Sequence, residues 1–339
     1  MSEYFGDCED KYPELVIEII EYFDAQNREP DPTDKKTILK FCEQHKVGPD
    51  LIYQPQIVSR ICKRLCEHGR MECLRSLGAM GINDNYLSLI NTKGSSFKSS
   101  RERLKFYFNS MVYGFDYIYR MYKDLVVPFV WEKENGDYSA GTGFKFMDGI
   151  VTTKHCITGV KNLQIKGYKA SDLAEKTVYI SDNDGVDLAF IQTGELADPL
   201  LFTEEGEVMQ EVLVLGYPKI PAFTDFLTAE KATISSKASS RITPTKGNIA
   251  AFGYEYLSKF DAMLITAKVR GGNSGGPVIN QNGCLVGVAC QIPDYSNTNG
   301  EYDDLGYGVA VPVGYVTDII VRKPKQLEIP TGFYRDFVD

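Results

Sequence analysis

The spacing of apolar residues along the chain changes near position 125. Before this point, apolar residues recur every three or four positions, which is typical of helices that bury one face. After it, short apolar runs alternate with Gly, Asn and Asp turn signals, which is typical of antiparallel β-structure. The first helix is predicted over residues 12–26, with core positions Leu15, Val16, Ile19, Ile20 and Phe23. We therefore expect a helical N-terminal region followed by an all-β region.

A second pattern occupies residues 34–92 of the N-terminal region. Helices are predicted over residues 35–44 and 55–67, and strands over residues 71–77 and 86–90. Two helices followed by a hairpin resemble a winged helix-turn-helix. The sequence therefore predicts a small regulatory module at this place.

The charge of this module differs from that of the whole chain. Residues 34–100 hold eleven Lys or Arg against six Asp or Glu, a net of +5, whereas the chain carries −9. The second helix presents Arg60, Lys63 and Arg64, which either face nucleic-acid phosphates or form the solvated face of a protein-docking module. The overall negative charge argues against a protein that binds nucleic acid over its whole surface.

An aromatic-rich stretch connects the two regions. Residues 101–124 are predicted to form one linking helix that packs between the regions. Its apolar positions are Leu104, Phe106, Tyr107, Phe108, Met111, Val112, Phe115, Ile118, Tyr119 and Tyr122. Because aromatic helices are more often core than ligand sites, we assign this helix a structural role.

One turn in the β-rich region stands out by its glycines. It has the sequence Gly272-Asn273-Ser274-Gly275-Gly276-Pro277, and an apolar run follows it. Flanking glycines leave room for a substrate carbonyl beside the serine. They also let the neighbouring backbone N–H groups turn toward one point, as an oxyanion hole requires. The turn is therefore a candidate nucleophile site.

A serine needs a base to become a nucleophile, and histidine titrates in the right range. The chain has three histidines. His45 and His68 lie in the helical region, so His155 alone shares the β-rich region with Ser274. His155 follows a predicted strand, Asp-Gly hairpin turn and second strand over residues 141–153. It is therefore the candidate base.

The candidate acid lies between His155 and Ser274 along the chain. An acidic loop leads into an apolar strand, and Asp187 stands at their junction. A carboxylate there would hold the imidazole in the correct tautomer. Asp182 and Asp184, in the same loop, are rival acids.

The order His, Asp, Ser separates this chain from two other hydrolase folds. The turn also fits the G-x-S-x-G pattern of α/β-hydrolases, but that fold needs a histidine after the serine. No histidine follows Ser274. A subtilisin-like order needs an aspartate before His155, and Asp148 fits better as a hairpin-turn residue. Both readings are rejected.

Residues 125–322 resemble the chymotrypsin/trypsin-like serine proteases, and within them the HtrA/Deg-like bacterial branch. The resemblance rests on motifs that occur in the same order as in that family. They are Gly141-Thr142-Gly143-Phe144, Thr152-Thr153-Lys154-His155-Cys156, Asp187-Leu188-Ala189-Phe190, Gly272-Asn273-Ser274-Gly275-Gly276-Pro277, Val212–Pro218 and Gly306–Pro312. The resemblance is specific for fold and chemistry, and it says little about the substrate.

The resemblance implies two packed antiparallel β-barrels with the active site between them. His155 and Asp187 would come from the first barrel and Ser274 from the second, with the barrel boundary near residues 196–208. The implied chemistry is acyl transfer by a Ser-His-Asp triad, with Gly272 and Ser274 as oxyanion hole. The implied substrate is a protein or peptide, and no cofactor is expected.

The primary specificity pocket is expected at Lys268, Ala289 and Cys290. The family position that often floors this pocket is Lys268, six residues before the serine. A buried ammonium there would favour an acidic substrate side chain, but we prefer the reading in which Lys268 reaches solvent. The long segment of residues 221–258 is a candidate lid.

The eight cysteines bear on location and on metal binding. In secreted relatives, the cysteine that follows the catalytic histidine forms a disulfide with an earlier cysteine. Ala140 occupies the position of that earlier cysteine here, so Cys156 lacks that partner. Free thiols and an N-terminus without a secretory signal predict a cytoplasmic protein. Cys62, Cys66 and Cys73 lack a C-x₂-C pair, so no metal site is expected. No apolar run reaches the ~20 residues that span a membrane.

These observations predict three parts. Residues 1–124 form an N-terminal regulatory domain, residues 125–325 a trypsin-like protease domain, and residues 326–339 a C-terminal tail. A PDZ domain is not expected after the protease domain. The most direct interpretation is an intracellular serine endopeptidase, and the alternative is a catalytically silent protease fold that binds or regulates. A regulatory protein or nucleic acid is the expected partner of the N-terminal domain.

Overall fold

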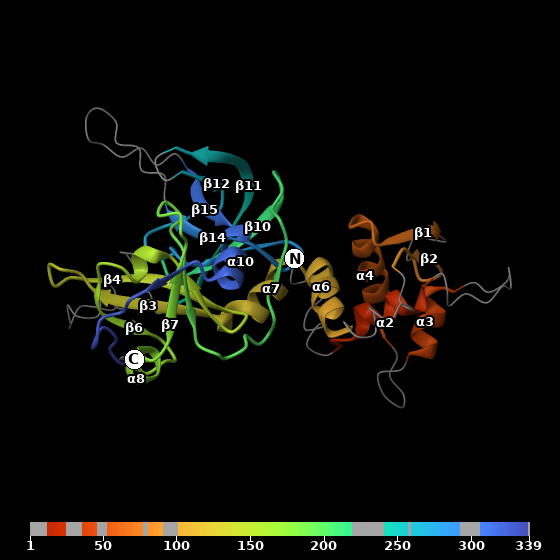
Figure 1. The fold of residues 1–339 in the computed structure, drawn as a ribbon. Helices are drawn as coiled ribbons and strands as arrows, with labels where there is room; N and C mark the ends of the chain where they lie inside the picture. The colour runs from red at the N-terminus through yellow and green to blue at the C-terminus, as the bar shows by residue number, and fades with distance from the viewer. Residues whose placement is uncertain are drawn as a thin grey trace, which may run out of the picture. The chain divides into compact units, whose positions relative to one another are not determined.

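The chain divides into two compact units, residues 1–118 and 119–339. The computed structural model describes residues 12–24, 36–45, 53–76, 81–90, 101–218, 241–256, 259–291 and 306–337. The first unit, red to orange in Figure 1, is mainly helical, and the second, yellow to blue, is mainly β-structure. The predicted order of a helical region followed by a β-rich region is therefore confirmed. The predicted domain boundaries at 124 and 325 stay predictions.

The described residues of the first unit before residue 101 form three helices and a hairpin. These elements are α2 (Leu15–Tyr22), α3 (Ile38–Gln44), α4 (Pro55–Glu67), β1 (Met71–Arg75) and β2 (Asn85–Ser88). Strands β1 and β2 are antiparallel, with Met71 opposite Ser88. Helix α4 buries Val58, Ile61 and Cys62, as its apolar spacing requires. Helices α3 and α4 and the hairpin follow in the order that the winged-helix pattern predicted.

The connecting stretch forms two helices where the sequence predicted one. Helix α6 spans Arg101–Tyr113 and α7 spans Phe115–Tyr122, and the 3₁₀ turn η3 (Lys123–Leu125) follows. Gly114 separates the helices because it adopts a φ of 74°, a left-handed conformation that interrupts a right-handed helix. Apolar spacing alone could not reveal this break.

The first β-sheet of the second unit is antiparallel and has the strand order β16-β7-β8-β5-β4-β3-β6. Its strands are β3 (Val126–Glu132), β4 (Tyr138–Phe146), β5 (Gly149–Thr152), β6 (Lys161–Ile165), β7 (Thr177–Ile180), β8 (Ala189–Gln192) and β16 (Lys325–Leu327). The short helices η4 (Lys154–Cys156) and α8 (Ala170–Ala174) lie within this part of the chain. The β4–β5 hairpin turns at Met147 and Asp148, one residue before the predicted Asp-Gly pair, because Gly149 already pairs with Phe146.

The C-terminal segment contacts both edges of this sheet. Strand β16 pairs with the edge strand β7. Further along, Leu163 of the other edge strand, β6, donates its N–H to the Phe333 carbonyl (3.0 Å) and accepts from Arg335 N–H (2.9 Å). Phe333 and Tyr334 are buried in the core of the sheet. Part of the segment predicted to be a tail thus forms backbone hydrogen bonds with β7 and with β6, on opposite sides of the open sheet.

The second sheet closes by pairing among its own strands. Six strands run in the order β13-β10-β11-β12-β15-β14, and a β13–β14 pairing joins the ends, while β9 adds to β14. The strands are β9 (Phe202–Thr203), β10 (Glu211–Gly216), β11 (Thr243–Glu255), β12 (Phe260–Ile265), β13 (Pro277–Asn280), β14 (Cys284–Gln291) and β15 (Gly308–Pro312). Helix α10 (Val313–Arg322) follows β15 (Figure 1). The predicted chymotrypsin-like double β-structure is confirmed, with one closed barrel and one open sheet.

Two further findings concern the described residues. Seven cysteines there are free thiols: Cys42, Cys62, Cys66, Cys73, Cys156, Cys284 and Cys290. No helix in the described ranges is long and apolar enough to cross a membrane. In the predicted lid, residues 221–240 and 257–258 lie outside the described ranges, whereas β11 occupies most of the remainder.

Candidate active site

His155 and Asp187 are joined by two hydrogen bonds. His155 lies in η4, which follows β5, and Asp187 lies two residues before β8, the strand that pairs with β5. The backbone N–H of His155 donates to Asp187 Oδ1 (3.0 Å), and its ring Nδ1 lies 2.6 Å from Asp187 Oδ2. One carboxylate thus fixes both the main chain and the ring of the histidine. With the proton on Nδ1, the lone pair of the neutral imidazole is on Nε2.

The rival acids of the same loop bind elsewhere. Asp182 lies 3.4 Å from Arg322, and Asp184 lies 3.3 Å from Lys325. Lys154 Nζ also donates to the Asp184 carbonyl (2.7 Å). The geometry therefore favours Asp187 as the partner of the imidazole, as the position at the head of the strand predicted.

The surroundings of His155 change its proton affinity. Burial lowers the pKa of His155, but the hydrogen bond with Asp187 and the neighbouring Cys156 outweigh burial and raise the pKa from the ordinary 6.5 to about 10. A carboxylate stabilises the imidazolium, which is the form that appears after the ring accepts a proton. The pair is thus suited to hold a proton taken from a neighbouring hydroxyl.

Ser274 lies in a turn whose conformation requires glycine. Asn273 N–H donates to the Arg270 carbonyl (2.9 Å), and Gly272 has a φ of 100°. A bond from residue i to i+3 with a positive φ at i+2 describes a type II turn, which favours glycine there. Among the described residues, the N–H groups of Gly272 and Ser274 donate to no protein group. They are available to an external oxygen.

The fold brings this turn beside the His155 loop. The thiol of Cys156 lies 3.9 Å from the Ser274 carbonyl oxygen. The Ser274 hydroxyl, however, donates to the Cys290 carbonyl on β14 (3.0 Å), and no hydrogen bond joins it to His155. Catalytic hydrogen bonds are often formed only with substrate present, and a serine hydroxyl is redirected by rotation about one side-chain bond. The structure therefore places a serine hydroxyl and a carboxylate-bound imidazole in adjacent loops, without a hydrogen bond between them.

Comparison with known proteins bears on the identity of this fold. Residues 141–288 match the family described as trypsin-like peptidase domain. These residues of the second unit are therefore similar to a trypsin-like peptidase domain. Serine protease Rv3671c of Mycobacterium tuberculosis is 31% identical over 195 residues, which cover 57% of this chain and 44% of that protein. A probable periplasmic DegP-like serine endoprotease of Rickettsia conorii is 27% identical over 189 residues, covering 54% of this chain and 33% of that protein.

Among solved structures, the active form of the Rv3671c protease is similar, with 23% identity, a TM-score of 0.45, and coverage of 63% of this chain and 87% of that one. The predicted resemblance to HtrA/Deg-like serine proteases is confirmed by the curated relatives. The chain spans between 28% and 44% of the length of the curated relatives it matches.

The three residues predicted to form the specificity pocket differ in how far they are buried. Lys268 is exposed, so its ammonium is not buried. Ala289 and Cys290 are buried on β14. Their carbonyls accept hydrogen bonds from the turn Gly272–Pro277, which we call the nucleophile turn. The Ala289 carbonyl accepts from Gly275 N–H and the Cys290 carbonyl from the Ser274 hydroxyl. Burial raises the pKa of the Cys290 thiol, which keeps it neutral. A role of these three residues in specificity stays a prediction.

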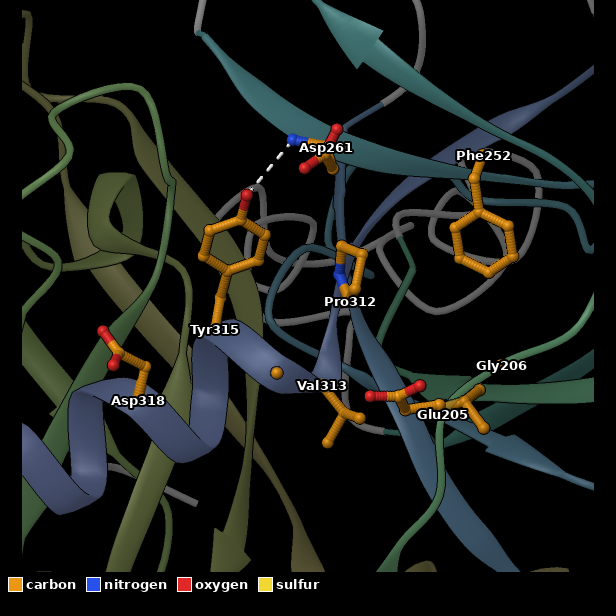
Figure 2. Close-up of a pocket in the computed structure, with 10 residues that line it drawn as sticks. Glu205, Gly206, Phe252, Asp261, Pro312, Val313, Tyr315 and Asp318 are labelled. Carbon is orange, nitrogen blue, oxygen red and sulfur yellow. Dashed lines mark hydrogen bonds between the residues drawn. The ribbon is translucent and has the colours of Figure 1, made fainter.

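A pocket of about 680 Å³ opens elsewhere in the peptidase domain (Figure 2). Its apolar wall includes Phe252, Pro312 and Val313, and its acidic groups are Glu205, Asp261 and Asp318. Tyr315 stands on its α10 side, where its hydroxyl accepts from Asp261 N–H (3.2 Å; Figure 2). No member of the His155, Asp187 and Ser274 set lines this pocket, so the set belongs to a different site.

Neither unit shows a metal site within the part of the chain that the structure describes. No group of three or more His, Cys, Asp or Glu side chains there is placed to hold an ion. The thiols of Cys62 and Cys66 instead belong to helix α4, where burial raises the pKa of both, that of Cys66 to about 11. A thiol with a raised pKa remains protonated and is a poor zinc ligand.

Sequence reasoning missed one residue that contacts the nucleophile turn directly. Thr142 was quoted only as part of a family motif, yet it makes hydrogen bonds to both Gly272 and Ser274. The separation of 130 positions between Thr142 and Gly272 left no local pattern to reveal this contact.

Proposed function

We propose that this chain is a serine endopeptidase that cleaves proteins or peptides through an acyl-enzyme. The observation that carries the proposal is the double hydrogen bond between His155 and Asp187 beside a glycine turn that holds Ser274. The relatives named as serine proteases support it.

In the proposed mechanism, the Ser274 hydroxyl leaves the Cys290 carbonyl and turns to His155 Nε2. Its oxygen attacks the peptide carbonyl while Nε2 takes the proton, and Asp187 stabilises the resulting imidazolium. The N–H groups of Gly272 and Ser274 bind the negative oxygen of the tetrahedral intermediate. The same proton passes to the leaving amine, and water then hydrolyses the ester in a second cycle.

A fluorophosphonate probe followed by a protein substrate tests this proposal. We expect the probe to label the full chain on Ser274, located by mass spectrometry, and casein to be hydrolysed. Ser274→Ala should lose both, whereas Ser171→Ala, which removes an exposed hydroxyl on α8, should lose neither. Labelling without hydrolysis of any protein or peptide would favour the alternative, a silent protease fold that binds or regulates. No labelling would remove the enzyme assignment.

The N-terminal unit is proposed as the regulatory part of this peptidase. Arg60 and Lys63 on α4 are exposed, and Arg64 bonds to Glu67 (2.9 Å). Nucleic acid is one candidate partner and a regulatory protein is the other. Binding to duplex DNA that weakens with salt and is lost in Arg60→Ala/Lys63→Ala would support the first, because phosphate contacts release counterions. Absence of binding at low salt would favour protein docking.

A reducing compartment, such as the cytoplasm, is proposed for the protein. All seven described cysteines are free, and oxidising compartments favour disulfides. Thiol titration of the protein isolated from its native cell tests this, since reactive free thiols are expected and disulfide-linked species would contradict the placement.

A further inference from the structure

Thr142 connects the two sheets of the peptidase domain at the nucleophile turn. It lies on β4 of the first sheet and is fully buried. Its backbone N–H donates to the Ser274 carbonyl (2.9 Å), and its side-chain Oγ1 donates to the Gly272 carbonyl (2.6 Å). The turn itself belongs to the second sheet, between β12 and β13. One residue of the first sheet therefore holds two carbonyls on either side of the nucleophile.

Both ends of the Thr142 hydroxyl are in use. Tyr217 N–H donates to Oγ1 (3.0 Å), which leaves the hydroxyl proton for Gly272. The Thr142 carbonyl in turn accepts from Thr152 Oγ1 (2.7 Å). A buried hydroxyl with both a donor and an acceptor partner has one defined orientation. The direction of its hydrogen bond to the Gly272 carbonyl is thereby fixed.

The two bonds from Thr142 fix the peptide groups Gly272–Asn273 and Ser274–Gly275, because each peptide unit is planar. The peptide that carries Ser274 N–H lies between the two carbonyls held by Thr142, and its own carbonyl, on Asn273, accepts from Gly276 N–H (2.9 Å). The peptide group between Gly272 and Asn273 is held at both ends, because Asn273 N–H donates to the Arg270 carbonyl (2.9 Å) and the Gly272 carbonyl accepts from Thr142. Loss of the Thr142 hydroxyl would remove one of these two restraints.

The Val212–Pro218 motif of the sequence supplies the second half of this arrangement. A Cβ added to Gly216 would lie 2.8 Å from Asn273 Oδ1 and 3.1 Å from its Cα, so glycine permits the close approach of this segment to the turn. The next residue, Tyr217, gives its N–H to Thr142 and anchors its own hydroxyl on the Val126 carbonyl (3.1 Å). The motif thus keeps the Thr142 hydroxyl oriented.

We infer that Thr142 is a positioning residue for the oxyanion hole, acting through the carbonyls of Gly272 and Ser274 from the opposite sheet. The inference rests on the proposed endopeptidase function. It assigns the side chain of the Gly-Thr-Gly-Phe motif a part in stabilising the transition state, without contact to the substrate.

Thr142→Val and Thr142→Ser test the inference on the full chain. Valine keeps the shape and removes the hydroxyl, so we expect kcat for a peptide substrate to fall by about 10- to 100-fold, less than the loss of an oxyanion-hole donor itself. KM should change by about twofold or less, because the lost contact acts in the transition state. Serine restores the hydroxyl and should recover most of kcat.

Thr193→Val is the matched control. Thr193 is also buried, and its hydroxyl also lies between a carbonyl, that of Asp148 (3.3 Å), and an N–H, that of Glu195 (3.3 Å). Loss of the Thr193 hydroxyl should lower the midpoint of thermal unfolding by about as much as Thr142→Val does, and it should leave kcat unchanged. If Thr142→Val does not fold, Thr142→Cys, which keeps a weak donor, is expected to fold and to show an intermediate loss of kcat.

The results separate this inference from the proposed function. A wild-type chain that neither reacts with fluorophosphonate nor hydrolyses peptides would end both. A wild-type chain that reacts, with Thr142→Val or Thr142→Cys reacting at the same rate, would end the inference alone. Equal losses of kcat in Thr142→Val and Thr193→Val would also overturn it, because they would show an effect of stability only.

Discussion

The two β-sheets of the peptidase domain contribute differently to the candidate site. The first sheet supplies His155 and Asp187, which are already joined through two hydrogen bonds. The second supplies Ser274, whose hydroxyl is bonded to Cys290 on its own sheet. The second sheet also closes through its own β13–β14 pair, whereas the C-terminal segment contacts both edges of the first.

This difference shows which contacts the site depends on. The base and its acid need only the pairing of β5 with β8, so they are set by one sheet. The proposed nucleophile and oxyanion hole depend on contacts between sheets, chiefly through Thr142. Substitutions in the first group should therefore change proton transfer, and those in the second should change transition-state geometry.

The largest effect is expected from Asp187→Asn. An amide cannot stabilise the imidazolium and favours the wrong tautomer, so kcat should fall by about 10⁴-fold. Asp182→Asn and Asp184→Asn remove neighbouring carboxylates that bond to Arg322 and Lys325, and they should stay within about twofold because exposed ion pairs contribute little. Steady-state kinetics on one peptide measures all three. An equal loss of kcat in Asp184→Asn would show that the assignment of Asp187 as the acid is wrong.

Gly275→Ala should have the next largest effect. The new Cβ would lie 2.0 Å from the Thr142 carbonyl oxygen and 2.5 Å from Thr152 Oγ1, so the contact between the turn and the first sheet must open. A displacement of about 1 Å in a site costs on the order of 100-fold in rate. Gly167→Ala is the control, since Gly167 has a similar φ of 85° but open space around it. Comparable losses in both would point to backbone strain alone.

The pH dependence tests the first sheet by itself. As the base, His155 must be neutral, so kcat/KM should rise tenfold per pH unit up to its raised pKa, above the ordinary 6.5 and toward about 10, and then level off. Asp187→Asn removes the main partner that raises the pKa of His155, so the midpoint should move to lower pH. An unchanged midpoint would mean that another group titrates.

The same shift in the pKa of His155 bears on stability. A group with a raised folded pKa binds its proton more tightly when folded. Its contribution is therefore complete below about pH 6.5 and is lost as pH rises through about 10. Denaturant unfolding of the wild type should show this loss, and Asp187→Asn should reduce it.

The smallest effects are expected in the C-terminal segment. Tyr334 is buried in the core of the first sheet, and its hydroxyl has no partner among the described residues. Tyr334→Phe should therefore be neutral or stabilise by up to about 1 kcal/mol, because an unsatisfied buried hydroxyl is removed. Tyr334→Ala should destabilise by about 3–5 kcal/mol through loss of the ring. Denaturant unfolding measures both, and a destabilised Tyr334→Phe would reveal an unseen partner.

The sequence predicted those features that local pattern determines. Apolar spacing and turn signals predicted the helices of the first unit and the succession of strands, and motif order singled out His155, Asp187 and Ser274. The break at Gly114 was missed, since a glycine is tolerated inside a helical pattern. Thr142 and the C-terminal segment were missed because their contacts join positions more than a hundred residues apart, which no local spacing records.

The central claim is that His155 and Ser274 act as one unit. A double-mutant cycle on kcat/KM tests it directly, with His155→Ala, Ser274→Ala and the double variant measured on the same peptide. Members of one catalytic unit are strongly non-additive. We expect the double variant to be no slower than Ser274→Ala alone. If the losses of the two single variants instead multiply in the double variant, the two side chains work independently and the account is contradicted.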